Sequence, residues 1–199
     1  MTGEPVTTLH DYQLSMLHVM CRTAPAHAAD LLDRIGATQA DTEIADKRWW
    51  WADAVNNFES LAEYETAWGT PESKNPHPEG SHIARFARWD LSFWPGLQIE
   101  LMEIPRKPGP VFRRLIRRSG LRLPCLETVA DLTPWACTQE EFENTELGPF
   151  HHFDGFGDHH VLIDFDATDP ESGRRRSCTA HFEWGLLQSV KGGAMNPEA

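Results

Sequence analysis

The spacing of apolar side chains predicts three helices in the first third of the chain. Thr8 and Asp11 have the pattern of a capping box and open the first helix. A second helix is expected from about Pro25 to Gly36, where a proline start is followed by a glycine stop. A third is expected over 48–68, because apolar residues recur there at helical spacing.

Alternation of apolar and polar residues predicts two β-hairpins in the rest of the chain. The first pairs 82–93 with 97–104 across a Pro-Gly turn signal. The second pairs 159–166 with 177–187. Both strands of the second hairpin have one apolar face, as expected for a sheet that covers a core.

Short helices are expected between the two hairpins. One covers 110–120, and a second begins after Thr138 and ends at Gly148. The order of these elements is typical of an α+β fold. We therefore expect N-terminal helices packed on an antiparallel sheet of about four strands (two hairpins), with one or two short helices between them.

Length and composition predict one soluble domain. A chain of 199 residues with 40% hydrophobic and 24% charged residues suits a single globular domain. We expect it over 8–188, with flexible termini at 1–7 and 189–199. The N-terminus has no signal-peptide pattern and no apolar run reaches membrane-spanning length, so we expect a cytoplasmic protein. The four cysteines form no CxxC pair and are expected to be reduced and buried.

Charge is distributed in two neighbouring blocks. Residues 106–122 hold seven basic and no acidic side chains, whereas 123–173 hold twelve carboxylates and no Lys or Arg. The blocks either offset each other in space or each face a partner of opposite sign. The net charge of −12 argues against nucleic-acid binding.

The helix predicted over 110–120 has an apolar side and a basic side. Its basic residues are Arg113, Arg114, Arg117 and Arg118. Guanidinium groups bind carboxylates and phosphates bidentately, so this face is a candidate site for an anionic ligand or an acidic partner. The alternative is a covering helix whose arginines pair with the acidic block that follows.

Three consecutive tryptophans open the helix predicted over 48–68. They cannot all face the core, because successive helical residues turn by about 100°. Trp49 falls opposite the apolar stripe and is therefore a candidate interface anchor. Packing in the core or in a loop is the alternative.

The second hairpin predicts a candidate metal site. When its apolar faces coincide, the opposite face carries His160, Asp164, His181 and Glu183. In one allowed register His160 lies across from His181, and in the next it lies across from Glu183. Two histidines and a carboxylate with open positions suit Zn, Mn or non-haem Fe.

Three more residues near this hairpin are candidate ligands. Asp158 joins from the preceding loop, while His152 and Asp154 have an HxD spacing. The alternative is that the hairpin has a polar, solvent-facing side that binds nothing.

Two functions are compatible with these features, and no family resemblance decides between them. The first, which we place ahead, is a small acidic protein-binding or inhibitory module, similar in role to an immunity protein or antitoxin, with a basic protein partner. The second is a metal-dependent enzyme acting on an anionic small molecule or phosphoester. The sequence has no Gly-rich phosphate loop, GxSxG, HExxH or Rossmann motif, so whether it is an enzyme stays open.

Overall fold

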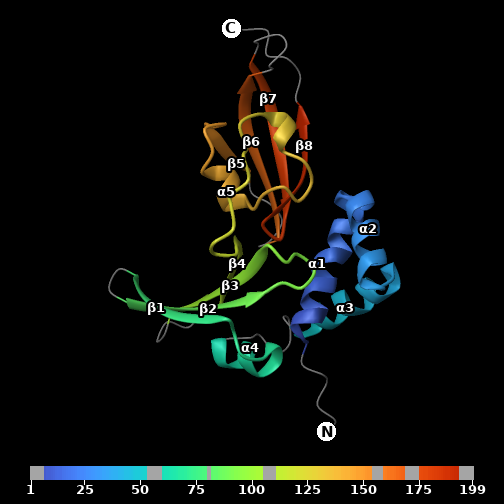
Figure 1. Ribbon diagram of the computed structural model, residues 1–199, viewed down its shortest axis with the longest axis vertical. Coiled ribbons are helices and arrows are strands. Elements are labelled where there is room, and N and C mark those ends of the chain that lie inside the picture. Colours follow the sequence, from blue (N-terminus) through green and yellow to red (C-terminus); the bar gives the residue numbers. More distant parts are fainter. Residues whose placement is uncertain are drawn as a thin grey trace. The chain divides into compact units, whose positions relative to one another are not determined.

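The chain divides into two compact units in a computed structural model (Figure 1). Unit 1 comprises Met1–Arg22 and Ala28–Arg118, and unit 2 comprises Thr23–His27 and Ser119–Ala199. The structure describes residues 7–52, 60–79, 82–104, 111–153, 159–168 and 175–192. The expected single domain over 8–188 stays a prediction.

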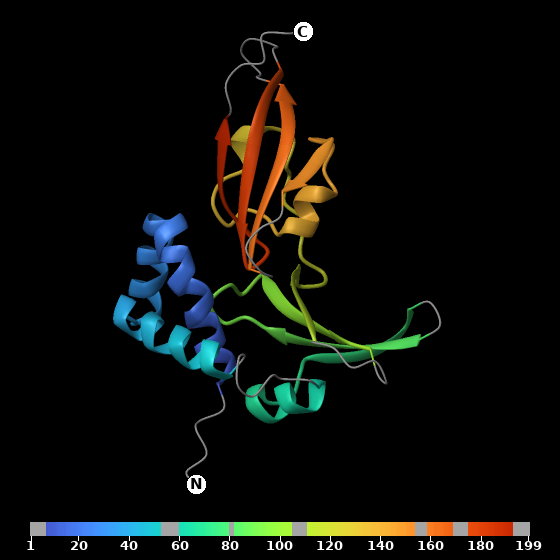
Figure 2. The ribbon, with the colours of Figure 1, turned by 180° about the vertical axis from the view of Figure 1, so that it is seen from behind.

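Helices precede a four-stranded antiparallel sheet, sheet A, in the first part of the chain. The described helices are α1 (Leu9–Thr23), α2 (Pro25–Ile35), α3 (Gln39–Trp51) and α4 (Leu61–Trp68). The strands of sheet A, in spatial order, are β1 (Ser73–Glu79), β2 (His82–Asp90), β3 (Leu97–Glu103) and β4 (Phe112–Arg117). Helix α4 packs on one face of this sheet, where Trp68 meets Trp89 edge to face (Figure 2).

Unit 2 repeats the order of helix before sheet. Its helical elements are η2 (Val129–Asp131) and α5 (Gln139–Glu143). The strands of its antiparallel sheet B, in spatial order, are β5 (Phe150–Phe153), β6 (His160–Thr168), β7 (Arg175–Glu183) and β8 (Leu186–Gly192). The α+β class with N-terminal helices is confirmed, and both predicted hairpins form. The expected sheet of about four strands is instead two sheets of four.

Local capping chemistry explains where the helices begin. The Asp11 N–H donates to Thr8 Oγ1 at the start of α1, as predicted. The same exchange between Thr38 and Asp41 opens α3 at Gln39, well before the predicted start at residue 48. The helix predicted over 48–68 is therefore wrong as a single element: α3 ends at Trp51, and α4 begins at Leu61.

The predicted helix over 110–120 is also wrong, because this segment forms the edge strand β4. Leu115 is buried on the face of sheet A that carries Trp89 and Ile99, and Arg114 lies on the opposite face beside Glu100. Successive side chains of this strand point to opposite faces. The segment therefore has no separate apolar and basic sides of the kind expected for a helix.

Trp49 is a core residue, so its predicted role as an exposed anchor is wrong. Its side chain is 2% exposed and packs against Tyr12 and Trp68, with the Arg113 guanidinium over its ring. Helix α3 buries Thr42, Ala45 and Trp49, which recur at helical spacing, and the exposed tryptophans of the triplet are Trp50 and Trp51.

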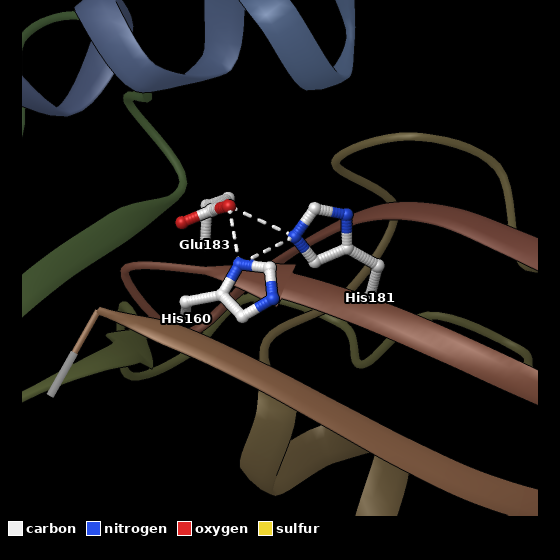
Figure 3. A group of neighbouring side chains, drawn as sticks. All are labelled: His160, His181 and Glu183. Carbon is white, nitrogen blue, oxygen red and sulfur yellow. Dashed lines mark hydrogen bonds and ion pairs between the residues drawn. The ribbon is translucent and has the colours of Figure 1, made fainter. Parts of the chain in front are cut away.

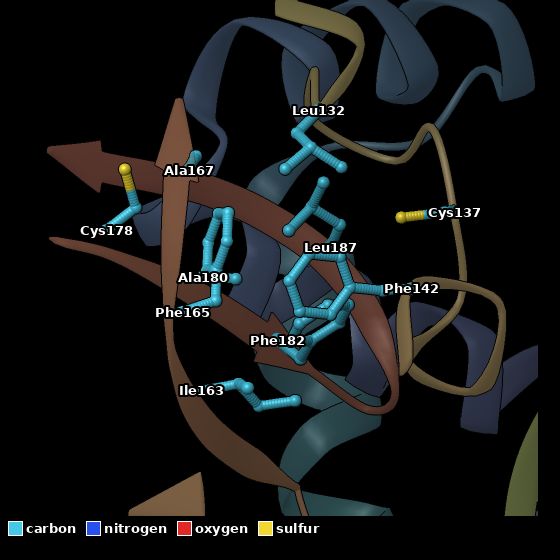
Figure 4. Packing of buried hydrophobic residues seen from close by; sticks show 10 residues of the cluster. All are labelled: Leu132, Cys137, Phe142, Ile163, Phe165, Ala167, Cys178, Ala180, Phe182 and Leu187. Atoms are coloured by element: carbon cyan, nitrogen blue, oxygen red, sulfur yellow. The ribbon is translucent and has the colours of Figure 1, made fainter. Parts of the chain in front are cut away.

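An apolar cluster between sheet B and the preceding segment forms the core of unit 2 (Figure 4). Phe142 of α5 contacts the rings of Phe150, Phe165 and Phe182. The cluster consists of Leu132, Cys137, Phe142, Ile163, Phe165, Ala167, Cys178, Ala180, Phe182 and Leu187. Strands β6 and β7 therefore bury the apolar face that the sequence pattern assigned to them.

The last strand of the predicted hairpin divides into β7 and β8. Trp184 and Gly185 connect them with φ values of 54° and 77°, as a two-residue hairpin loop of type I′ requires. Strand β8 extends to Gly192, so residues 189–192 belong to sheet B rather than to a flexible terminus. Thr7, expected in the other terminus, is buried.

None of the four cysteines, all within the described ranges, forms a disulfide, as expected, but the expected burial is wrong for Cys125. Cys137 and Cys178 are buried, and Cys125 is exposed. Within the described ranges, the structure has no helix of the length and apolarity needed to cross a bilayer.

Candidate metal centre

The register of β6 and β7 brings three predicted ligands together at one end of sheet B. His160 is the first residue of β6 and lies directly across from Glu183, the last residue of β7. His181 precedes Glu183 by two positions and therefore lies on the same face of the strand. The structure thus selects the second of the two registers that the sequence allowed.

Three side-chain atoms converge at this place (Figure 3). Glu183 Oε1 lies 2.8 Å from His160 Nδ1 and 2.8 Å from His181 Nε2. The two ring nitrogens are 3.0 Å apart. The other nitrogen of each ring points away from the carboxylate. We call these three residues the His-His-Glu cluster.

The cluster combines a buried carboxylate with more accessible imidazoles. The Glu183 side chain is 5% exposed, whereas that of His160 is 32% exposed. Burial by itself raises the pKa of Glu183, but hydrogen bonds from His181 and His160 outweigh it and lower the pKa below its ordinary value. The carboxylate is therefore held in the anionic form that binds a cation.

Hydrogen bonds alone do not satisfy all three polar atoms of the His-His-Glu cluster well. If both ring nitrogens donate to Glu183 Oε1, two N–H groups face each other across the 3.0 Å between His160 and His181. If one nitrogen instead accepts from the other, that N–H no longer points at the carboxylate. A cation among the three atoms interacts with all three lone pairs at once.

Trp184 and His159 hold the two strand ends that carry the cluster. Their rings stack with centroids 3.7 Å apart, and the backbone N–H of Trp184 donates to the backbone carbonyl of His159 at 2.6 Å. Sequence analysis did not find this pair. The only available signal was an aromatic residue and a histidine directly beside predicted ligands.

The other predicted ligands do not join the cluster in the described part of the chain. Asp154 and Asp158 lie outside the described residues. His152 belongs to β5 and pairs with Ile163 in the register, away from the end of β6 that carries His160. Asp164 shares the cluster's face of the sheet but accepts a hydrogen bond from the Thr179 hydroxyl at 2.6 Å.

The four candidate anion-binding arginines do not form one basic face. On β4, Arg114 binds Glu100 at 2.6 Å, and Arg113 lies on the opposite face over Trp49. Arg118 follows the strand and pairs with Asp90 at 3.3 Å. Glu100 and Asp90, the acidic partners of Arg114 and Arg118, both precede these arginines in the chain. Arg117 is four positions after Arg113 on β4 and therefore lies on the same face of the strand.

Comparisons with known proteins identify no family. No family model matches the chain, and no curated protein is similar to it. One solved structure, from Streptococcus mutans, is named "putative beta-lactamase inhibitor protein". It aligns over 69% of this chain and 84% of its own at 11% identity, with a TM-score of 0.26. A TM-score this low carries no argument about fold or function.

Proposed function

We propose that unit 2 binds one divalent transition-metal ion and that the protein is a metal-dependent enzyme. The observation that carries this proposal is the convergence of His160 Nδ1, His181 Nε2 and Glu183 Oε1 within 3.0 Å of one another. Imidazole nitrogen and carboxylate oxygen are the donors that Zn, Mn and non-haem Fe share.

The number of ligands favours a catalytic over a structural metal. Structural zinc sites are closed by four protein ligands, whereas catalytic centres keep positions for water or substrate. The cluster supplies three ligands, and the partial exposure of His160 gives small molecules access. These features support an enzyme more than a site that only stabilises the fold.

The arginines of β7 are too far away to hold a substrate at this metal. Arg176 and Glu183 are separated by seven positions on one strand, which is roughly 23 Å. Arg175 beside it pairs with Asp166 at 3.7 Å. Neither Arg175 nor Arg176 is therefore placed to hold an anionic substrate at the cluster.

Metal titration of the untagged full chain tests the proposal. After treatment with a chelator, the wild type is expected to bind one Zn(II), Mn(II) or Fe(II) per chain by native mass spectrometry. His181→Ala should lose this ion while keeping its far-UV circular dichroism, because one of three ligands is gone. His151→Ala, an exposed histidine of the same sheet, is the matched control and should bind normally. Absence of bound metal in the wild type, or equal binding by both variants, contradicts the proposal.

A second candidate function, the protein-binding or inhibitory module, rests on a different observation. Trp50 and Trp51 on α3 are 69% and 55% exposed. Tryptophan is enriched among residues that dominate binding energy at interfaces. A net charge of −12 suits a basic protein partner. These features support an immunity-like role in which α3 contacts the partner.

Paired serine substitutions test this second function. Affinity capture from the source organism is expected to recover a basic protein with the wild type and to lose it with W50S/W51S. The matched control is L121S/L123S, which removes another pair of exposed apolar side chains and should retain the partner. Equal recovery by the two double variants would exclude the tryptophans as the contact surface.

A further inference from the structure

Trp184 occupies a backbone conformation that its side chain disfavours. It directly follows the proposed ligand Glu183 and, with Gly185, forms the two-residue turn between β7 and β8. Its φ value is 54°, in the left-handed region where a Cβ atom is unfavourable and where such turns usually have Asn or Gly. Backbone strain of this kind persists where surrounding contacts hold it, and it is concentrated at functional sites. The turn does not require a tryptophan, so the reason for one lies in the contacts of its ring.

The indole ring of Trp184 packs on the residue that precedes the ligand of the neighbouring strand. Trp184 is 7% exposed and stacks on the imidazole of His159, with ring centroids 3.7 Å apart and ring planes 26° from parallel. The backbone hydrogen bond between the two residues adds a second contact. His159 and Trp184 thus form the pair that comes next after His160 and Glu183 in the register of β6 and β7.

This contact lies at the end of the β6–β7 ladder, where the proposed ligands are. His160 and Glu183 are the outermost pair of the ladder, which restrains them from one side. Strand ends open more readily than strand centres. The stacked rings of His159 and Trp184 restrain the same pair from the other side. Metal ligands must be held to within about 0.5 Å, and contacts outside the ligand set provide this restraint.

We propose that Trp184 is a positioning residue of the His-His-Glu cluster: its ring, held against His159, fixes the separation of His160 and Glu183. This role accounts for a tryptophan in a strained backbone conformation. The inference rests on the proposed metal site, and it adds a residue outside the ligand set on which the affinity for the metal depends.

Trp135 provides a matched control in the same unit. Its φ value is 64°, so it is also a tryptophan in the left-handed region. Its ring contacts His27 edge to face, and its Nε1 donates to Gln188 Oε1 at 3.3 Å. Trp135→Asn and Trp184→Asn therefore make the same chemical change in the same backbone conformation, and each removes a tryptophan–histidine contact. Of the two, Trp184 is the one adjacent in sequence to a proposed ligand.

Metal titration of the untagged full chain compares these variants. By isothermal titration calorimetry with Zn(II), or with Mn(II) if the wild type takes up no zinc, Trp184→Asn is expected to bind about tenfold more weakly or worse. Trp135→Asn should bind as tightly as the wild type, and so should Trp184→Phe, which keeps a flat ring against His159. His159→Ala should lose as much affinity as Trp184→Asn, and combining the two should add little.

Histidine ring signals report the positioning without a metal. In proton–carbon NMR spectra of the chelator-treated chain, the ring signals of His160 and His181 should move in Trp184→Asn and stay in place in Trp135→Asn. A tryptophan that only stabilised the fold would leave both signals in place in a variant whose far-UV circular dichroism is unchanged.

The outcomes separate this inference from the proposed function. A wild type that binds no metal contradicts the proposed function, and the histidine signals then decide: unmoved His160 and His181 signals in Trp184→Asn overturn the inference. When the wild type does bind metal, undiminished affinity in Trp184→Asn overturns it, and so does an equal loss in Trp135→Asn.

A second pair of variants keeps the inference testable if Trp184→Asn does not fold. His159→Ala and His27→Ala each remove the histidine of one tryptophan–histidine contact. The first is expected to weaken metal binding and to move the signals of His160 and His181, and the second is expected to do neither. Equal behaviour of these two variants overturns the inference.

Discussion

Replacement of Arg88 and Arg114 together by methionine is expected to destabilise the protein by about 3–5 kcal/mol. Both guanidinium groups bind Glu100 of β3, each at 2.6 Å. The three residues lie directly across from one another on β2, β3 and β4. The Glu100 side chain is only 1% exposed, so its charge has no access to water once both partners are gone.

The triple variant R88M/E100M/R114M distinguishes a buried charge from lost packing. It removes the carboxylate as well, and the methionines keep most of the apolar volume, so the larger part of the lost stability should return. Urea unfolding, monitored by circular dichroism, measures the free energy of unfolding of both variants and of the wild type. A triple variant no more stable than the double one would mean that packing of the arginine stems, rather than the buried charge, accounts for the loss.

The segment that forms β4 was predicted to be a helix because its apolar pattern fits both structures. Val111, Phe112, Leu115 and Ile116 fit both a helical face and a strand that buries every second residue. In the structure this segment pairs with β3, and Arg114 lies beside Glu100, which Arg88 of β2 also contacts. These contacts join strands that are separated in the sequence, so the local pattern of apolar and polar residues does not reveal them.

The sequence contains a signal that would have placed Trp49 correctly, namely the start of helix α3. Thr38 and Asp41 have the same spacing as Thr8 and Asp11, and both pairs form capping boxes. A helix begun at Gln39 includes Thr42 and Ala45, and these two residues share a buried side with Trp49. The sequence thus contained a correct start signal, and the stronger apolar stripe after residue 48 concealed it.

The candidate metal centre was predictable in part because a strand alternates with a period of two. Burial of Phe165 and Phe182 leaves His160, His181 and Glu183 on the other face in any register that keeps the apolar faces together. The choice between registers depends on how residues 169–174 connect the strands, and the pattern says nothing about that. The β7–β8 turn was hidden because Trp184 occupies a left-handed position that Asn or Gly usually takes.

Glu183→Gln is expected to weaken metal binding at least a hundredfold and to change how stability depends on pH. The substitution keeps the shape of the side chain but replaces an anionic donor by a neutral amide that binds divalent metals poorly. Loss of partners that only orient a ligand costs ten- to a hundredfold in affinity, and Glu183 is itself a ligand in the proposed site. Calorimetric titration with Mn(II) or Co(II) measures the change, with His151→Ala as the control.

The pH effect has a definite direction in metal-free protein. The pKa of Glu183 is lower in the folded chain than the ordinary value of 4.5, because hydrogen bonds from His181 and His160 outweigh burial. A carboxyl group with a depressed folded pKa stabilises the folded state above its unfolded pKa, and that contribution disappears as the pH falls through the folded value. The stability of wild type relative to Glu183→Gln should therefore fall on acidification below about pH 4.5.

Denaturant unfolding of both proteins across this range, in the presence of a chelator, gives the difference directly. Carboxylates that do not contact Glu183 titrate in both proteins and cancel, so the slope below about pH 4.5 belongs to Glu183. A difference that does not vary with pH would mean that the histidines do not hold this carboxylate in its charged form. A difference that instead grows on acidification would mean that burial dominates and that Glu183 is protonated in the folded chain, a state that does not serve as a metal ligand.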